Sequence, residues 1–352
     1  MRIKQLTILL SAVAAALLCG CAKEHTESEA DAAKREFDAW LAKNYPNATR
    51  TGRGVYIVSD TPGTGAAFNT DYDVFAVVDY VWKDLQGNVT ATSEADLAKQ
   101  IGSYKPANFY GSSTWAIFPT ETYAGIYDGI KDMRVGGTRV FITPSWLNTN
   151  ADYSSEEKYL KKYDPDDCTP SSIITVTLLE KIEDIEKYQI DSIDRYNIRT
   201  FGHKLDSARI GYYYLQTQKP TDDLSLKDST VYINYTGRLL NGQVFDTTIE
   251  DTAKLYNVYE PSRDYEPIKV SMGESVDKLK LGDSESNSGV ATSNMTSEGV
   301  IRGFAYTVFN MKHYEKGTCI FISSYGYAAK GSGSTIPAYA PLRFDIELVD
   351  KP

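Results

Sequence analysis

The sequence predicts an α+β protein of two similar domains, each an antiparallel half-barrel sheet wrapped on one short helix and each preceded by an extra helix. Three observations predict this class. The two halves of the chain repeat one order of helical and extended segments. The extended segments alternate apolar with polar residues or form β-branched runs. The 352 residues are enough for two domains of ~100–200 residues each.

An amphipathic helix is expected at the start of each half, because apolar residues recur there at helical spacing. In the first half the apolar face comprises Ala33, Phe37, Trp40 and Leu41. In the second half it comprises Ile182, Ile185, Ile193 and Tyr196. The second helix is predicted to link the two domains, within residues 181–210.

Two strands are expected after each of these helices. They are residues 54–58 and 77–81 in the first half, and residues 211–215 and 231–235 in the second. A turn with a glycine, Gly87 or Gly242, closes the second strand of each half.

The remaining elements also recur in the same order. Residues 128–133 and 306–311 are predicted to form the single short helix of each domain. The β-branched and aromatic runs predict central strands at 137–142, 173–178, 317–322 and 342–347. This alignment places Thr175 of the first half at the position of Phe344 in the second.

The N-terminus has the features of an export signal. Arg2 and Lys4 precede an apolar run, Leu6 to Leu18, of 13 residues, shorter than the ~20 that a membrane-spanning helix needs. The run ends in Leu-Cys-Gly-Cys, which resembles a bacterial lipobox. We therefore expect residues 1–20 to be a lipoprotein signal peptide and Cys21 to be lipidated. The alternative is an ordinary secretory signal with an unrelated cysteine.

The segment that follows the signal fits this interpretation. Residues 21–50 would form the tether and the N-terminal helix, and would hold the protein at the bacterial cell envelope. Ala22 follows the lipidated cysteine where aspartate would favour the inner membrane, so we expect the outer membrane. The sequence leaves open whether the protein faces the periplasm or the outside.

Composition argues against several other functions. The net charge is −10 and no basic block occurs, which disfavours nucleic acid as a partner. Cys168 and Cys319 fall in different predicted domains, so a disulfide between them is not expected. The three histidines lie far from any nucleophile motif, and the chain has no phosphate-loop sequence. We expect neither a metal nor a cofactor.

Four segments of the second half form an ordered set of aromatic and apolar residues. They are residues 231–248, 300–304, 325–337 and 342–348. In this order the set resembles the FKBP-type peptidyl-prolyl cis-trans isomerases. The resemblance covers residues 211–352 and is interrupted by two insertions, at 249–265 and 274–299, which we expect near the mouth of the pocket.

The resemblance implies the residues of an active-site pocket. The expected catalytic set is Tyr235, Phe245, Asp246, Ile301, Phe304, Tyr327 and Phe344. The expected substrate-binding residues are Ile268, Val300 and Ile336. Phe304 would be the floor, where the family usually has tryptophan, and Ile268 stands where relatives have phenylalanine. The Tyr327 hydroxyl and the Ile301 N–H would donate hydrogen bonds to substrate carbonyls, and Asp246 would be the carboxylate at the pocket edge.

Such a pocket suits the chemistry of proline isomerisation. Resonance opposes rotation about a peptide C–N bond by ~18–20 kcal/mol, although the two isomers before proline differ by only ~0.5–1 kcal/mol. An apolar pocket favours the twisted amide, whose carbonyl oxygen carries less negative charge than that of the planar amide. The reaction needs desolvation and positioning, and no nucleophile.

The first half keeps the plan but not these pocket residues. Thr90-Ala91 stands where the second half has Phe245-Asp246, and Ile126 stands where it has Phe304. Tyr80, by contrast, remains. We therefore expect residues 51–180 to be a degenerate FKBP-like domain that serves as a scaffold or a binding module.

The sequence thus predicts a lipid-anchored FKBP-type peptidyl-prolyl isomerase that assists the folding of exported proteins. Its partners would be proline-containing polypeptide clients and the membrane, and residues 211–352 would be the catalyst. The alternative is a non-catalytic, lipid-anchored protein-binding or chaperone module built on the same two domains.

Overall fold

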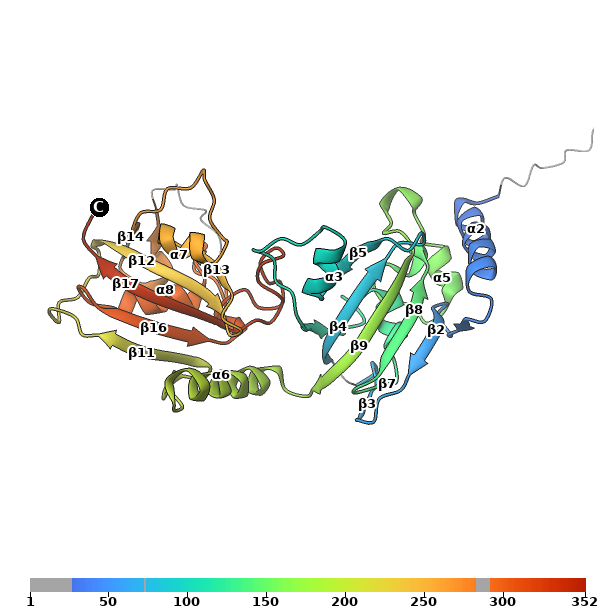
Figure 1. Cartoon of the computed structure of the whole chain (residues 1–352), viewed down its shortest axis with the longest axis horizontal. Coiled ribbons are helices and arrows are strands. Elements are labelled where there is room, and N and C mark those ends of the chain that lie inside the picture. Colours follow the sequence, from blue (N-terminus) through green and yellow to red (C-terminus); the bar gives the residue numbers. More distant parts are fainter. Residues whose placement is uncertain (1–26, 73, 283–291) are drawn as a thin grey trace, which may run out of the picture.

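The computed structural model describes residues 27–72, 74–282 and 292–352. The predicted signal peptide and Cys21 lie outside these residues. Two domains, each built on one antiparallel sheet, follow each other along the chain (Figure 1). The α+β class and the repeated plan are therefore confirmed. Within the described residues, no helix combines the length and the apolar character needed to cross a membrane.

The first domain is built on seven strands. Their order across the sheet is β1 (Thr49–Arg50), β2 (Tyr56–Thr61), β8 (Thr138–Thr143), β9 (Ser172–Ile182), β4 (Phe75–Lys83) and β5 (Val89–Thr92), with β6 (Ser113–Ala116) also paired to β4. A small second sheet pairs β3 (Ala67–Phe68) with β7 (Met133–Arg134). The helices are α2 (Glu29–Asn44), α3 (Ala95–Gln100), α4 (Ala124–Gly129) and α5 (Glu156–Leu160), with 3₁₀ turns at Ser145–Leu147 and Pro165–Asp167.

The second domain follows the same order with eight strands. Across the sheet they are β10 (Ser207–Arg209), β11 (Tyr212–Gln218), β16 (Lys316–Phe321), β17 (Leu342–Val349), β12 (Thr230–Leu239), β14 (Ile268–Ser271) and β15 (Lys280–Leu281), with β13 (Val244–Thr247) paired to β12. The helices are the linker α6 (Ile185–Phe201), α7 (Glu250–Leu255) and α8 (Arg302–Asn310), with 3₁₀ turns at Val276–Lys278 and Ser323–Tyr325.

A buried apolar cluster lies on each face of the second sheet. On the inner face Tyr212 joins the core that includes α8 residues such as Phe304. On the outer face Tyr213 packs with Ile193 of α6 and with Ile320. Successive residues of a strand point to opposite faces, so a tyrosine run can serve both layers. In the first domain α2 packs similarly, with Phe37 against Tyr56 at a ring distance of 5.7 Å.

The short helix of each domain lies close to its sheet at a glycine. A Cβ on Gly303 of α8 would lie 2.6 Å from the ring of Phe321, and one on Gly125 of α4 would lie 1.9 Å from the Thr143 hydroxyl. Only glycine permits this approach. The register of the repeat can therefore be fixed at this point: Thr143 corresponds to Phe321.

Strand pairing corrects one predicted equivalence between the domains. Phe344 pairs with Cys319 and Gly237, whereas Thr175 pairs with Val140 and Val81. Ile174 pairs with Phe141 and Trp82. Phe141 and Trp82 occupy the positions that Cys319 and Gly237 have in the second domain. The counterpart of Phe344 is therefore Ile174, because strand pairing, and not the similarity of apolar sequence segments, defines which positions of the two domains are equivalent.

Two predicted helix positions also differ from the structure. The short helices begin earlier than predicted, at Ala124 and Arg302, and Met133 belongs to β7. Ile182 is the last residue of β9, where it pairs with Phe75. The linker helix starts at Ile185 because the Asp184 side chain accepts a hydrogen bond from the Lys187 N–H at 3.0 Å and caps it.

The linker helix attaches firmly to the second domain. The Gln189 side-chain oxygen accepts a hydrogen bond from the Ser323 N–H at 2.7 Å. The Arg343 guanidinium donates to the Tyr196 hydroxyl at 2.7 Å. In Figure 1, α6 runs alongside β11.

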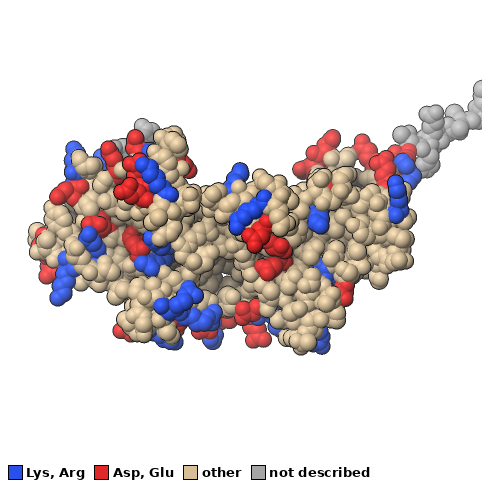
Figure 2. Space-filling view, in the orientation of Figure 1, with Lys and Arg blue, Asp and Glu red and all other residues tan. Residues whose placement is uncertain are grey.

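Acidic and basic side chains are interspersed over the face drawn in Figure 2, and no basic block gathers there.

Candidate active site

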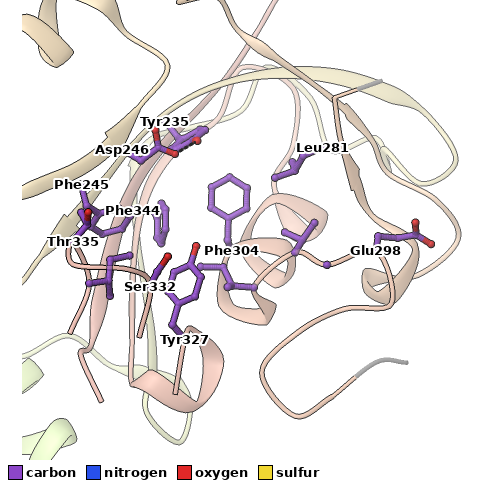
Figure 3. Close-up of a pocket in the computed structure, with 14 residues that line it drawn as sticks. Tyr235, Phe245, Asp246, Leu281, Glu298, Phe304, Tyr327, Ser332, Thr335 and Phe344 are labelled. Atoms are coloured by element: carbon purple, nitrogen blue, oxygen red, sulfur yellow. Dashed lines mark hydrogen bonds between the residues drawn. The ribbon is translucent and has the colours of Figure 1, made fainter. Parts of the chain in front are cut away.

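A cavity of about 430 Å³ opens in the second domain, between the β12–β13 hairpin, the start of α8 and the 325–337 loop (Figure 3). Nine of the ten predicted pocket residues line it. They are Tyr235, Phe245, Asp246, Val300, Ile301, Phe304, Tyr327, Ile336 and Phe344. They come from four segments far apart in the chain, and the sheet and α8 bring them together. The space between them is open.

Aromatic rings form the floor and one wall of the cavity. Phe304, 3% exposed, is the floor. Its ring centroid lies 5.3 Å from that of Tyr235 and 5.1 Å from that of Phe344, both edge-on. Phe245 meets Phe344 at 5.5 Å. Such T-shaped contacts are the arrangement that aromatic quadrupoles favour, so the rings hold one another in place.

Gly237 makes room for this wall. A Cβ there would lie 2.5 Å from the Phe245 ring and 2.9 Å from the Phe344 ring. Both distances are far below normal contact. The absence of a side chain at Gly237 thus lets the two rings pack over the β12 backbone.

A polar cluster occupies one edge of the cavity. The Tyr235 hydroxyl donates a hydrogen bond to Asp246, and the Arg263 guanidinium forms an ion pair with the other oxygen of the same carboxylate. Burial and the neighbouring carboxylate raise the pKa of Tyr235. Both Asp246 oxygens are thereby engaged. The cluster fixes the Tyr235 ring and leaves an apolar cavity surface beside it.

Two hydrogen-bond donors remain available to a ligand. The Tyr327 hydroxyl points into the cavity in Figure 3 and has no hydrogen-bond partner among the described residues. The Ile301 N–H, at the N-cap of α8, likewise makes no hydrogen bond within the described part of the chain. Burial raises the pKa of Tyr327, so its hydroxyl keeps its proton. Donors in an apolar cavity suit peptide carbonyl groups.

Ile268 is the predicted residue that the structure does not bring to the cavity. It lies in β14, pairs with Ile233 of β12 and packs at the margin of the core. The cavity also includes five residues outside the predicted set. They are Leu281, Glu298, Gly299, Ser332 and Thr335. Leu281 and Glu298 come from the segment 274–299, which was predicted as an insertion near the mouth of the pocket, although its sequence did not indicate which of its residues would line the cavity.

Arg263 was also missed. It lies in the other predicted insertion, residues 249–265, yet it reaches Asp246. Part of this segment has a counterpart in the first domain, because α7, which lies in residues 249–265, corresponds to α3. An unpaired carboxylate expected at the pocket edge was the one signal that could have prompted a search for a nearby cation.

The first domain has a different cavity at the corresponding place. Tyr80 occupies the position of Tyr235. The Tyr80 N–H donates to the Ser93 hydroxyl at 2.9 Å, and the Tyr235 N–H donates to the Thr248 hydroxyl at 3.0 Å. Trp82 pairs with Ala91 where Gly237 pairs with Asp246. The cavity beside Tyr80 measures about 650 Å³, and residues 333–338 of the second domain contribute to its lining. None of the described residues that line it carries a carboxylate.

The chain was compared with known proteins. Residues 269–349 match the family model described as FKBP-type peptidyl-prolyl cis-trans isomerase. Among curated proteins no match was found.

Several solved structures are similar. The structure of the three FKBP domains of wheat FKBP73 is 14% identical, with a TM-score of 0.27, and the similarity covers 84% of this chain and 94% of that one. A peptidyl-prolyl cis-trans isomerase from Pseudomonas syringae pv. tomato is 18% identical, with a TM-score of 0.29, over 47% of this chain and 92% of that one. FkpA from Escherichia coli is 20% identical, with a TM-score of 0.30, over 47% of this chain and 62% of that one.

Proposed function

We propose that the second domain, in which residues 269–349 match the family model of FKBP-type peptidyl-prolyl cis-trans isomerases, isomerises X-Pro bonds in exposed polypeptide chains. The observation that carries the proposal is the open, aromatic-lined cavity with two unpaired donors, Tyr327 and Ile301. Among the described residues that line it, no nucleophile is paired with a base, and the reaction needs no such pair.

The proposed mechanism is desolvation with positioning. The prolyl ring enters over Phe304, between Tyr235 and Phe344, where water is excluded. The Tyr327 hydroxyl and the Ile301 N–H hold the flanking carbonyl groups. The planar amide loses more hydration on entering than the twisted amide, whose oxygen carries less charge, and the barrier falls. The Tyr235–Asp246–Arg263 cluster keeps the wall rigid and takes no proton from the substrate.

We also propose a cellular role that rests on the sequence. The lipobox at Cys21 would anchor the chain in the outer membrane of a bacterial cell envelope. Its clients would be exported proteins that contain proline. Substituting Cys21→Ser and following both palmitate incorporation and membrane fractionation tests the anchor, since a soluble, unlabelled variant is expected.

A protease-coupled assay on a proline tetrapeptide tests the activity. Wild-type protein should accelerate isomerisation, and the variant carrying Tyr327→Phe with Asp246→Ala should lose most of that acceleration. A wild-type rate equal to that in buffer would favour the alternative, a non-catalytic binding module. The replacement of the family's usual floor tryptophan by Phe304 is the observation that keeps this alternative open.

A further inference from the structure

One loop of the first domain reaches across to the active-site cavity of the second. This loop, residues 105–111, lies between α3 and β6. Its Phe109 N–H donates a hydrogen bond to the Ser334 carbonyl at 2.8 Å. The Ser334 hydroxyl donates to the Asn108 side-chain oxygen, also at 2.8 Å. Two bonds therefore join the loop to the tip of the segment that carries Ile336.

The same loop also holds the opposite wall of the cavity. The side-chain amide of Gln243 donates to the carbonyls of Ala107 and Asn108, each at 3.2 Å. Gln243 lies in the turn of the β12–β13 hairpin, and the cavity residues Phe245 and Asp246 follow it after Val244. One loop thus binds both the hairpin that forms one wall and the loop that forms the other.

The 105–111 loop is itself seated rigidly. The Phe109 side chain is half-buried against the core of the second domain. Gly111 has φ +144°, and a Cβ on it would lie 3.2 Å from the Phe109 ring, so glycine lets the chain fold back over that ring. A second ring contact between the domains, Phe75 with Tyr339 at 5.2 Å, lies just beyond the same cavity wall.

The wall segment has little internal support of its own. Between Ser332 and Ile336 it is held by an isolated bridge, with the Ser332 N–H bonded to the Ile336 carbonyl at 2.8 Å and the Ile336 N–H to the Ser332 carbonyl at 3.1 Å. Gly331 and Gly333 take positive φ values of 61° and 54°. Glycine loses the most conformational freedom when it is ordered. Bonds from the 105–111 loop therefore add to the few internal bonds that hold this wall.

We propose that the 105–111 loop is a positioning element of the isomerase site: the first domain, without a complete pocket of its own, sets the separation of the two pocket walls of the second. This inference rests on the proposed function for its kinetic consequence. Asn108 and Gln243 act through the walls and do not touch the substrate. The first domain then contributes to turnover through the walls of a pocket that lies in the second domain.

The test uses the full chain with Asn108→Ala, which removes the acceptor for Ser334. Amide hydrogen exchange at Ser332 and Ile336 should accelerate about two- to tenfold, the range that one net hydrogen bond supports. KM for a proline tetrapeptide should rise by a similar factor with little change in kcat, because the wall contacts the substrate throughout the reaction. Asn108→Asp keeps an acceptor oxygen and should restore both.

Two controls make the result specific. Ser112→Ala alters a neighbouring residue whose hydroxyl bonds to Asp79 inside the first domain at 2.8 Å, and it should leave exchange at Ser332 and KM unchanged. Ser334→Ala removes the same bond from the other side, so the double variant with Asn108→Ala should be no worse than either single variant.

The outcomes separate the two proposals. Unchanged exchange and KM in Asn108→Ala, or equal effects in Ser112→Ala, would overturn the positioning role. If wild-type protein shows no isomerase activity, the proposed function fails, while the exchange comparison still decides whether the loop restrains the wall.

Discussion

The hydroxyl of Tyr327 offers the sharpest test of how the pocket acts. It points into the cavity and has no partner among the described residues. The change Tyr327→Phe therefore removes a group that the folded chain does not use, while the ring keeps its packing. Activity should fall and the free energy of unfolding should stay the same within experimental error. A catalytic and a structural role thus predict different results.

The size of the effect follows from the bond that would be lost. An uncharged hydrogen bond contributes about 0.5–1.5 kcal/mol net. Each 1.36 kcal/mol is a factor of ten in rate, so kcat/KM should fall by about two- to tenfold. Tyr235→Phe makes a useful contrast. Its hydroxyl is bound to Asp246, so that variant should lose stability as well as activity, because a carboxylate oxygen loses its donor.

The assay is protease-coupled isomerisation of a proline tetrapeptide, with urea unfolding of the same preparations. Tyr314→Phe is the matched control: its hydroxyl bonds to Asp350 outside the cavity, at the end of the chain, and kcat/KM should be unchanged. The reasoning is refuted if Tyr327→Phe retains full kcat/KM. It is equally refuted if the variant unfolds at much lower urea, since the hydroxyl would then have a structural partner.

Three further predictions concern the pocket and its tyrosines. Gly237→Ala should cost about 1–3 kcal/mol of stability by overpacking and lower kcat/KM, because its Cβ would displace the rings of Phe245 and Phe344; a urea midpoint and a rate equal to wild type would contradict this. From pH 6 to 9, kcat/KM should be constant, because burial raises the pKa of Tyr235 above its ordinary value near 10 and no histidine is found among the described residues that line the cavity. A bell-shaped profile would contradict this, since it would indicate a titrating acid or base. Stability should decline above about pH 10, because burial raises the pKa of Tyr212 and Tyr235, and the unfolded chain therefore releases protons that the folded chain retains. Urea midpoints that stay level from pH 9 to 11.5 would exclude this effect.

The order of motifs predicted most of the pocket because it depends on local sequence. Tyr235 and Phe344 each sit in an alternating strand whose inward face the period of two defines. Phe304 sits in a short helix whose glycine neighbour permits contact with the sheet. In such segments the face of each residue follows from the segment itself. Ile268 is different: its strand lies between β12 and β15, which both contribute to the cavity, yet its own side chain is not part of the lining, and its position in the sequence did not indicate this.

Sequence patterns did not predict contacts between segments that are far apart in the chain. Arg263 reaches Asp246 from a segment with no strand periodicity. The equivalence of Ile174 and Phe344 required the pairing register, since a shift of one residue in a strand turns every side chain to the other face. Both depend on where chains lie in space, which spacing along the chain does not encode.

The sequence by itself determined the class and the repeat, because periodicity and residue type act over a few neighbouring residues, whereas the expected pocket residues came from the resemblance to a family. Tertiary structure alone decided how the two domains meet. Phe109 and Ser334 are separated by more than two hundred positions, yet they share a hydrogen bond. Such a contact arises only when α6 packs on the second sheet and fixes the direction in which the first domain faces. The physical reason is that side-chain periodicity selects a face, whereas the packing of whole elements selects a neighbour.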